Sequence, residues 1–165
     1  RDPERIAHDL EHFNITPAAA RDIFGAVLDA DEQVDVAATA KNRDQIREAR
    51  LKRLANGHVS REIHSGETTL AAGDNLAVYG TSKAAHWACA HCAADLGPLA
   101  DNYKDVCLRE DLPVSASNPL VGDPINFIDN AVAFRLFYCP ECGSQIDNEI
   151  AVEHDPVMRD IELVL

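Results

Sequence analysis

The chain has 165 residues, 46% of them hydrophobic and 26% charged, and its formal net charge is −13 at pH 7. This composition excludes a disordered polymer and is sufficient for one sizeable domain with a peripheral arm. No apolar run approaches the roughly 20 residues of a membrane-spanning helix, and Arg1-Asp2-Pro3-Glu4 has no signal-peptide pattern. We therefore expect a cytoplasmic protein that makes no use of a membrane.

The charge is unevenly distributed. Residues 41–61 carry seven basic and two acidic side chains, whereas residues 62–165 carry five basic and seventeen acidic ones. A basic segment beside an acidic body is consistent with electrostatic docking to a partner, and equally with a solvated helix face. The acidity of the body argues against nucleic acid as the partner, because the body would repel its phosphates.

The N-terminal part of the chain predicts helices. Asp2 is suited to cap a helix with Pro3 at its first position, and Thr16-Pro17 repeats this start signal. Apolar residues at helical spacing follow each start and predict one buried stripe per helix. These stripes are Ile6, Leu10 and Phe13 in the first helix, and Ile23, Phe24, Val27 and Leu28 in the second.

A third helix is predicted from Val36 or Lys41 to Asn56, with Gly57 as its stop. Its apolar edge, too thin for a helix inside a core, consists of Ile46, Leu51 and Leu54. We therefore expect residues 1–57 to form a helical arm that lies on a partner or on the rest of the chain.

Beyond this arm the pattern changes to short segments between turn residues. The punctuating glycines, typical of turns between strands, are Gly66, Gly73, Gly80 and Gly97. A two-residue period leads into Cys139, with Val132, Phe134, Leu136 and Tyr138 at the alternate positions. Residues 146–152 are expected to return as the next strand, and residues 111–130 to be an irregular insertion. The fold class is therefore α+β, with residues 58–165 as a mainly antiparallel β domain.

Four of the five cysteines form two Cys-x-x-Cys pairs, Cys89 with Cys92 and Cys139 with Cys142. Two intervening residues let the chain turn so that both sulfurs of a pair face one cation. Four thiolates complete a tetrahedral zinc shell and leave no position for water, so we expect a structural zinc site in a zinc-ribbon-like domain. The 46 residues between the pairs, 93–138, exceed a compact ribbon, and the site would join distant parts of the chain.

Alternative interpretations of these residues stay open. A thioredoxin-like redox pair would begin a helix in a βαβ unit, and an iron–sulfur cluster also takes four thiolates.

His86 and His91 flank the first pair, where they could replace a cysteine as a metal ligand or lie on the surface without a role. Cys107 is expected to be a small buried residue. His8 and His12 are spaced as a chelating pair, but we expect them to face solvent. The histidines without any spacing that indicates a second site are His58, His64 and His154.

The sequence has no phosphate-binding loop, dinucleotide fingerprint, His-Glu-x-x-His motif or nucleophile with an evident activating base. We therefore expect no catalytic residues and an accessory subunit in a hetero-oligomer. Two other classes stay open. One is a zinc-ribbon adaptor for an acyl carrier, a nucleotide carrier or nucleic acid, and the other is a free-standing metal hydrolase whose zinc keeps an open position.

Two sequence elements resemble a known family. Asp101-Asn102-Tyr103-Lys104 is similar to the Asn-aromatic-Lys element of acetone carboxylase gamma subunits. Phe137-Tyr138-Cys139-Pro140-Glu141-Cys142-Gly143, with Ile146 to Val152 and Asp155-Pro156, resembles their second knuckle and acidic tail. The similarity covers residues 75–165 well, and the arm, including Arg1 to Arg5, loosely. The first knuckle, Cys89-Ala-His-Cys92-Ala, departs from the family's usual Gly-His sequence, which favours the acetophenone carboxylase branch.

The resemblance implies a small zinc subunit of the acetone and acetophenone carboxylase family, with Cys89, Cys92, Cys139 and Cys142 as the zinc ligands. Such complexes carboxylate a ketone with bicarbonate, driven by ATP. In them, ATP and the ketone are bound by larger hydantoinase A/B-like subunits, which the small subunit would brace or bridge.

Overall fold

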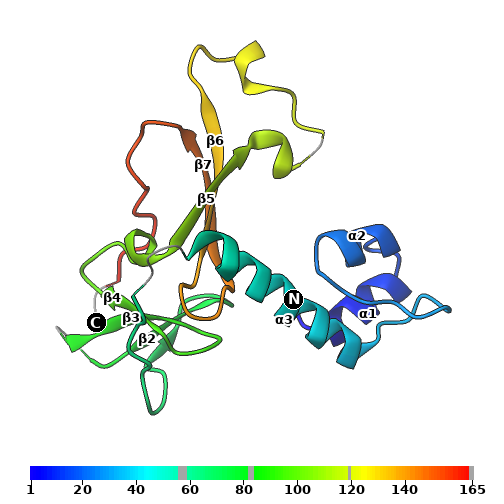
Figure 1. Ribbon diagram of the computed structural model, residues 1–165, viewed down its shortest axis with the longest axis horizontal. Helices are drawn as coiled ribbons and strands as arrows, with labels where there is room; N and C mark the ends of the chain where they lie inside the picture. The colour runs from blue at the N-terminus through cyan, green and yellow to red at the C-terminus, as the bar shows by residue number, and fades with distance from the viewer. Residues whose placement is uncertain (56–58, 82–83, 119, 164–165) are drawn as a thin grey trace. The chain divides into compact units, whose positions relative to one another are not determined.

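The computed structural model describes residues 1–55, 59–81, 84–118 and 120–163 (Figure 1). The chain forms two compact units, Arg1–Arg50 and Leu51–Leu165, which are described separately. Helices at the N-terminus are followed by antiparallel sheets, which confirms the α+β class. The domain boundary expected after residue 57 stays a prediction, and the helix stop at Gly57 lies outside the described residues, as do His58 and Pro119. Among the described residues, no helix has the length and apolarity to cross a membrane.

Both predicted helix starts in the first unit are confirmed. Helix α1 spans Pro3–Glu11, and the Asp2 carboxylate accepts a hydrogen bond from the backbone N–H of Glu4 at 2.8 Å. Helix α2 spans Pro17–Asp22, and the Thr16 hydroxyl accepts one from the N–H of Ala19 at 3.1 Å. Each cap satisfies a backbone donor that the first helical turn leaves without a partner.

The apolar stripes predicted for these helices are wrong in part. Ile6 is buried with Ala20 and Ala26, but Phe13 lies beyond the end of α1 at φ 57° and is 93% exposed. Helix α2 ends too early to include the second stripe. Ile23 is 73% exposed, and Leu28 instead pairs with Val34 in an antiparallel bridge. The tight reversal between Leu28 and Val34 therefore replaces the helical turns that the spacing suggested.

Helix α3 spans Val36–Leu54, and Thr39 is its only residue that is fully buried. The Thr39 hydroxyl accepts from the N–H of Val27 at 2.9 Å, and Asn42 donates to the carbonyl of Gly25 at 3.0 Å. The helix thus holds the loop before it through polar side chains. This agrees with the prediction that its apolar edge is too thin for a core.

The second unit contains two antiparallel sheets. The first is a four-stranded sheet in the order β1-β2-β3-β4, and the second is a three-stranded sheet in the order β5-β6-β7. The strands of the first sheet are β1 (Leu70–Ala71), β2 (Leu76–Tyr79), β3 (His86–Cys89) and β4 (Asp95–Pro98). Those of the second are β5 (Leu108–Pro113), β6 (Val132–Tyr138) and β7 (Gln145–Val152). Side chains of β2, β3 and β4, including Trp87, form one core with Cys139, which follows β6, and with Ile146 of β7.

The strand predicted to enter Cys139 is confirmed as β6, and its two faces are buried to different extents. At the start of β6 the alternate residues Ala133 and Arg135 are buried, whereas Val132 and Phe134 are only partly covered. Both faces are buried from Leu136 onward. A charged side chain, Arg135, therefore occupies the interior at this point of the strand.

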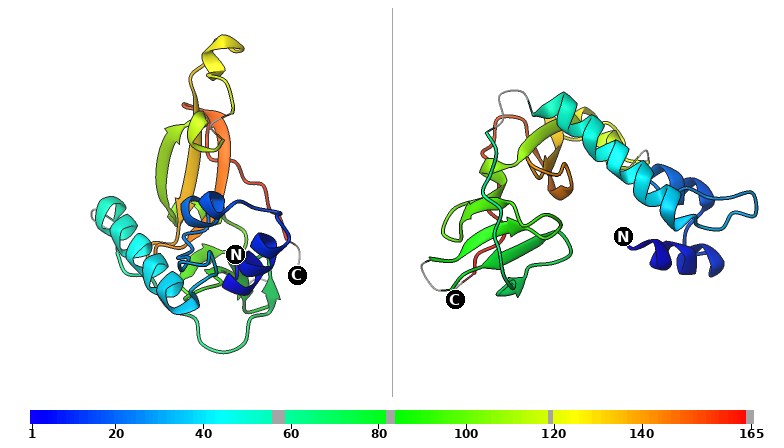
Figure 2. Two further views of the ribbon diagram at one scale, coloured as in Figure 1. Left: turned by 90° about the vertical axis from the view of Figure 1, so that its right-hand side faces the viewer. Right: turned by 60° about the horizontal axis from the view of Figure 1, so that its bottom comes forward.

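The predicted insertion, residues 111–130, is shorter than expected. Its first three residues, 111–113, belong to β5, which pairs with β6 along its full length. The segment that follows contains the short 3-10 helices η3 (Val114–Ala116) and η4 (Pro124–Asn126). Figure 2 shows this segment, in yellow, projecting beyond the end of the three-stranded sheet.

Candidate metal centre

The two cysteine pairs sit in turns of the same design, one after β3 and one after β6. In the first turn, the Ala93 N–H donates to the Cys89 carbonyl at 2.9 Å, and the Cys89 N–H donates to the Ala94 carbonyl at 2.9 Å. In the second turn, the corresponding bonds join Gly143 with Cys139 at 2.9 Å and Cys139 with Ser144 at 2.8 Å. The two Cys-x-x-Cys pairs therefore form turns with the same backbone hydrogen bonds. This equivalence supports the description of the domain as zinc-ribbon-like.

Backbone N–H groups are directed at the sulfurs in both turns. The backbone N–H of His91 donates to the sulfur of Cys89, and the backbone N–H of Cys142 donates to the sulfur of Cys139. A hydrogen bond of this kind favours the thiolate form of the accepting sulfur. To present these donors the chain turns back at positive φ just after each pair, at Ala93 (φ 58°) and Gly143 (φ 68°).

The positive φ of Ala93 leads to a stability prediction. A left-handed conformation is unfavourable for alanine and easy for glycine. Ala93→Gly should therefore raise the free energy of unfolding by about 0.5–1 kcal/mol, measured by thermal denaturation of the metal-loaded chain. Gly143→Ala is the matched control and should lower it. Equal effects of the two substitutions would contradict the explanation.

The four sulfurs converge on one point. Sγ of Cys89 lies 3.7 Å from that of Cys142, and Sγ of Cys92 lies 3.6 Å from that of Cys139. All four Sγ atoms lie within 4.8 Å of one another. These separations are far longer than the ~2.05 Å of a disulfide. They match the ~3.8 Å edge of a tetrahedron with ~2.3 Å zinc–sulfur bonds, so the residues present fit a metal such as zinc.

The thiols also influence one another electrostatically. Hydrogen bonds from the thiols of Cys139, Cys89 and Cys92 lower the pKa of the Cys142 thiol. Contact with the Cys142 and Cys89 sulfurs raises the pKa of Cys139. Without a cation, one of these thiols ionises at the expense of another, because adjacent negative charges repel. A divalent ion would remove this conflict and let all four become thiolates.

The remaining cysteine and the knuckle histidine have other surroundings. Cys107 packs against the core, donates to the Tyr103 carbonyl at 3.4 Å, and has its pKa raised to about 12 by burial. The prediction of a small buried residue is therefore confirmed only in part, because Cys107 is half-buried. His91 is exposed and lies 3.0 Å from the side-chain oxygen of Asn75, rather than among the sulfurs. His8 and His12 stack on each other in solvent, also as expected.

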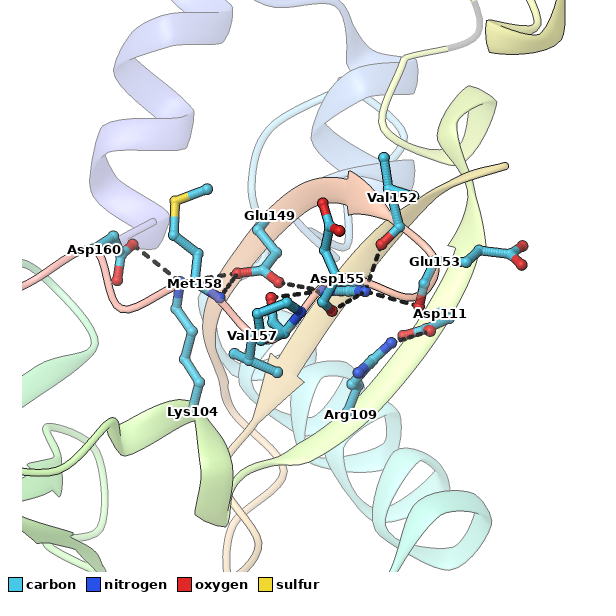
Figure 3. Close-up of polar contacts among 12 residues, drawn as sticks. Lys104, Arg109, Asp111, Glu149, Val152, Glu153, Asp155, Val157, Met158 and Asp160 are labelled. Atoms are coloured by element: carbon cyan, nitrogen blue, oxygen red, sulfur yellow. Dashed lines mark hydrogen bonds and ion pairs between the residues drawn. The ribbon is translucent and has the colours of Figure 1, made fainter. Parts of the chain in front are cut away.

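A separate cluster of ionic and polar contacts surrounds the buried side chain of Arg135, which belongs to strand β6 of the three-stranded sheet. Its guanidinium pairs with the Glu149 carboxylate at 2.9 Å. The same guanidinium donates to the carbonyls of Val152 at 2.8 Å, Glu153 at 3.0 Å and Asp155 at 2.9 Å. Figure 3 shows the segment after β7 curling so that these carbonyls face one centre. A single arginine thus fixes the path of the chain after the last strand.

Lys104 extends this cluster towards Tyr103. Its ammonium is fully buried and lies 3.0 Å from Asp160 and 3.4 Å from Glu149 (Figure 3). A third carboxylate, that of Asp147, lies 3.1 Å away. Burial alone would lower the pKa of Lys104, but the hydrogen bonds and ion pairs with Asp160 and Asp147 raise it. The charge therefore persists in the interior, where several carboxylates balance it.

None of the sequence predictions included this ionic cluster. One signal was available, because Arg135 interrupts an otherwise apolar strand, and a lone charge in such a strand must be paired or lie at an edge. Lys104 appeared only within the Asn-Tyr-Lys element. The structure explains that element: Asn102 caps η2 (Tyr103–Val106), while Tyr103 donates to Asp147 at 2.7 Å.

These features define the class: an α+β protein whose zinc-ribbon-like part carries a closed cluster of four cysteines. Comparison with protein families then identifies it further. The family model of the acetone carboxylase gamma subunit matches residues 64–165, more than half of the chain and both knuckles. The chain belongs to this family. The comparison with curated proteins gave no match.

Proposed function

We propose that this chain is a zinc-stabilised, non-catalytic subunit of an ATP-dependent carboxylase that acts in the cytoplasm on a ketone such as acetone or acetophenone. Cys89, Cys92, Cys139 and Cys142 hold the zinc, which has a structural role. ATP and bicarbonate are used by larger, hydantoinase A/B-like subunits. The observation that carries this proposal is the family match over residues 64–165, which includes all four converging cysteines.

The closed geometry of the cysteine cluster supports a structural role for the metal. Four protein thiolates fill a tetrahedral shell, and a catalytic zinc instead keeps one position for water or substrate. We therefore assign the carboxylation reaction of the complex to its larger subunits. Four cysteine sulfurs that can complete one tetrahedral shell therefore favour scaffolding over the free-standing hydrolase.

The surface of this chain offers a contact site for those partners. Leu120, Ile125 and Phe127, in the segment between β5 and β6, are 90%, 64% and 79% exposed. Exposed apolar side chains gathered in one projecting segment are typical of protein interaction sites. The segment also carries Asp123 and Asp129 and no basic residue. Its partner surface is therefore expected to be an apolar pocket with a basic rim on a large carboxylase subunit.

This assignment predicts the behaviour of a double variant, Leu120→Ser with Phe127→Ser. When the tagged chain is co-expressed with the large subunits of a ketone carboxylase, the wild-type chain should purify with them in a fixed ratio. The double variant should lose at least about tenfold in recovered partner, because truncating apolar anchors at an interface costs more than 1 kcal/mol each. The measurement is the subunit ratio after size-exclusion chromatography.

The matched control is Ile23→Ser with Phe13→Ser, which replaces exposed apolar residues of the first unit. It should leave the subunit ratio unchanged, and both variants should keep the metal content of the wild type. A wild-type chain that never associates with the large subunits would refute the proposed function. Normal assembly of the β5–β6 variant would refute only the location of the interface.

A further inference from the structure

A second group of potential ligands lies on the four-stranded sheet. Nδ1 of His86 is 2.7 Å from Oδ1 of Asp95, and Nε2 of His64 is 3.1 Å from the same oxygen. The three ligand atoms all lie within 4.8 Å of one another. Nothing in the sequence spacing indicated this group, because its members are 22 and 9 residues apart along the chain.

The fold fixes each member independently. His86 begins β3 and Asp95 begins β4, two strands that pair with each other. His64 follows Ile63, which forms an isolated bridge with Ala94 beside Asp95. The ring of His64 stacks on Tyr79 with centroids 5.0 Å apart. The three side chains are therefore brought together by sheet pairing and ring stacking, without needing an ion to order them.

The surroundings restrain the carboxylate as well. Arg61 donates through Nε to the Asp95 carbonyl at 3.2 Å, and its NH2 group lies 3.7 Å from Oδ2. This leaves Oδ1 directed at the two imidazoles. Burial alone would raise the pKa of Asp95, but hydrogen bonds from His86 and His64 lower it, so the carboxylate is ionised at neutral pH.

We propose that His64, His86 and Asp95 bind a divalent first-row transition-metal ion, at a site separate from the four cysteines. Two imidazole nitrogens and one carboxylate oxygen are a ligand set that such ions accept. The ion pair between Arg61 and Oδ2 restrains the carboxylate from outside the proposed ligand shell. The side chains of His86 and His64 are 36% and 20% exposed, which leaves room for water to complete the shell. This proposal does not depend on the carboxylase assignment.

The two sites should differ in their affinity for metal ions and in the absorption spectrum of the cobalt that they bind. The cysteine site offers four thiolates, whereas this site offers a single negative charge beside the positive Arg61. We therefore expect weaker binding here than at the cysteines. Cobalt bound to nitrogen and oxygen gives d–d absorption without the sulfur-to-cobalt charge-transfer band that thiolates produce.

The test is titration of the full chain with Co²⁺ after its cysteine site has been loaded with one zinc, at about pH 8, where imidazole is neutral. The expected result is one equivalent of bound Co²⁺, with d–d bands and no charge-transfer band. His86→Ala and Asp95→Asn should each weaken this binding at least tenfold. His154→Ala, which removes an exposed histidine outside the group, should leave it unchanged.

The proposal is overturned if the zinc-loaded chain takes up no further Co²⁺, if Co²⁺ merely replaces zinc among the sulfurs, or if His86→Ala binds as the wild type does. Circular dichroism and retained zinc report whether each variant is folded. Should Asp95→Asn fail to fold, His86→Ala decides the question, because its side chain is partly exposed at the start of a strand.

Discussion

Replacing Cys139 by serine should release the metal and unfold the second unit. Cys139 is fully buried between the two sheets, and its sulfur lies 3.6 Å from that of Cys92. Zinc binding in small domains contributes about 10–16 kcal/mol of apparent free energy, most of which appears as folding free energy. This exceeds the whole stability of a typical domain, ~5–15 kcal/mol, so loss of one ligand should abolish cooperative unfolding of this unit.

The measurements are metal content by mass spectrometry and near-ultraviolet circular dichroism of Trp87, which lies in the core beside the cysteines. We expect about one zinc per wild-type chain, and a strong chelator should reproduce the effect of the substitution. Cys107→Ser is the matched control, since this cysteine lies outside the cluster, and it should keep the metal. A Cys139→Ser chain that stays folded without zinc would show that the metal has no structural role.

The second large effect concerns Arg135. Arg135→Met keeps most of the side-chain volume but removes the charge from a site where the guanidinium is fully buried and Glu149 is 6% exposed. Breaking a buried ion pair on one side costs about 3–5 kcal/mol. We expect a loss near the lower end of this range, because Glu149 keeps the Lys104 ammonium at 3.4 Å. The backbone carbonyls of Val152, Glu153 and Asp155 lose a donor at the same time.

The control for this substitution is Arg109→Met on the neighbouring strand β5. Arg109 pairs with Asp111 at 2.6 Å, but both side chains are more than a third exposed at the surface (Figure 3). Exposed pairs contribute about 0–1 kcal/mol, so Arg109→Met should be nearly silent in urea denaturation of the metal-loaded chain. Comparable losses in the two variants would mean that burial does not determine the contribution of Arg135.

The sequence predicted well those features that depend on local rules. Asp2-Pro3 and Thr16-Pro17 are start signals read within one helical turn, and both helices begin there. The strand before Cys139 and the returning strand predicted over residues 146–152, observed as Gln145–Val152, follow from alternation and a short turn. The convergence of the four cysteines was also predicted, because the chemistry of a shared cation requires it regardless of the length of the intervening chain.

What the sequence did not predict depends on partners that are distant along the chain. The hydrogen-bond partners of Arg135 were not predicted, because the carbonyls that accept from it belong to Val152 at the end of β7 and to residues beyond it, such as Asp155. His64 showed no meaningful spacing because its neighbour Asp95 is reached only through the pairing of Ile63 with Ala94. Phe13 was assigned to a core that the helix, ending at Glu11, does not reach.

The separation of the two knuckles affects how the protein matures during synthesis. The first pair emerges from the ribosome 46 residues before Cys139, a delay of roughly 2–9 s at about 5–20 residues per second. During that interval the nascent chain can offer only two thiolates, a half-site open to oxidation or to a soft cation such as copper(I). Correct metallation therefore requires the second knuckle to arrive before a competing reaction. The supply of zinc and the reducing state of the cell should determine how much of the protein matures correctly.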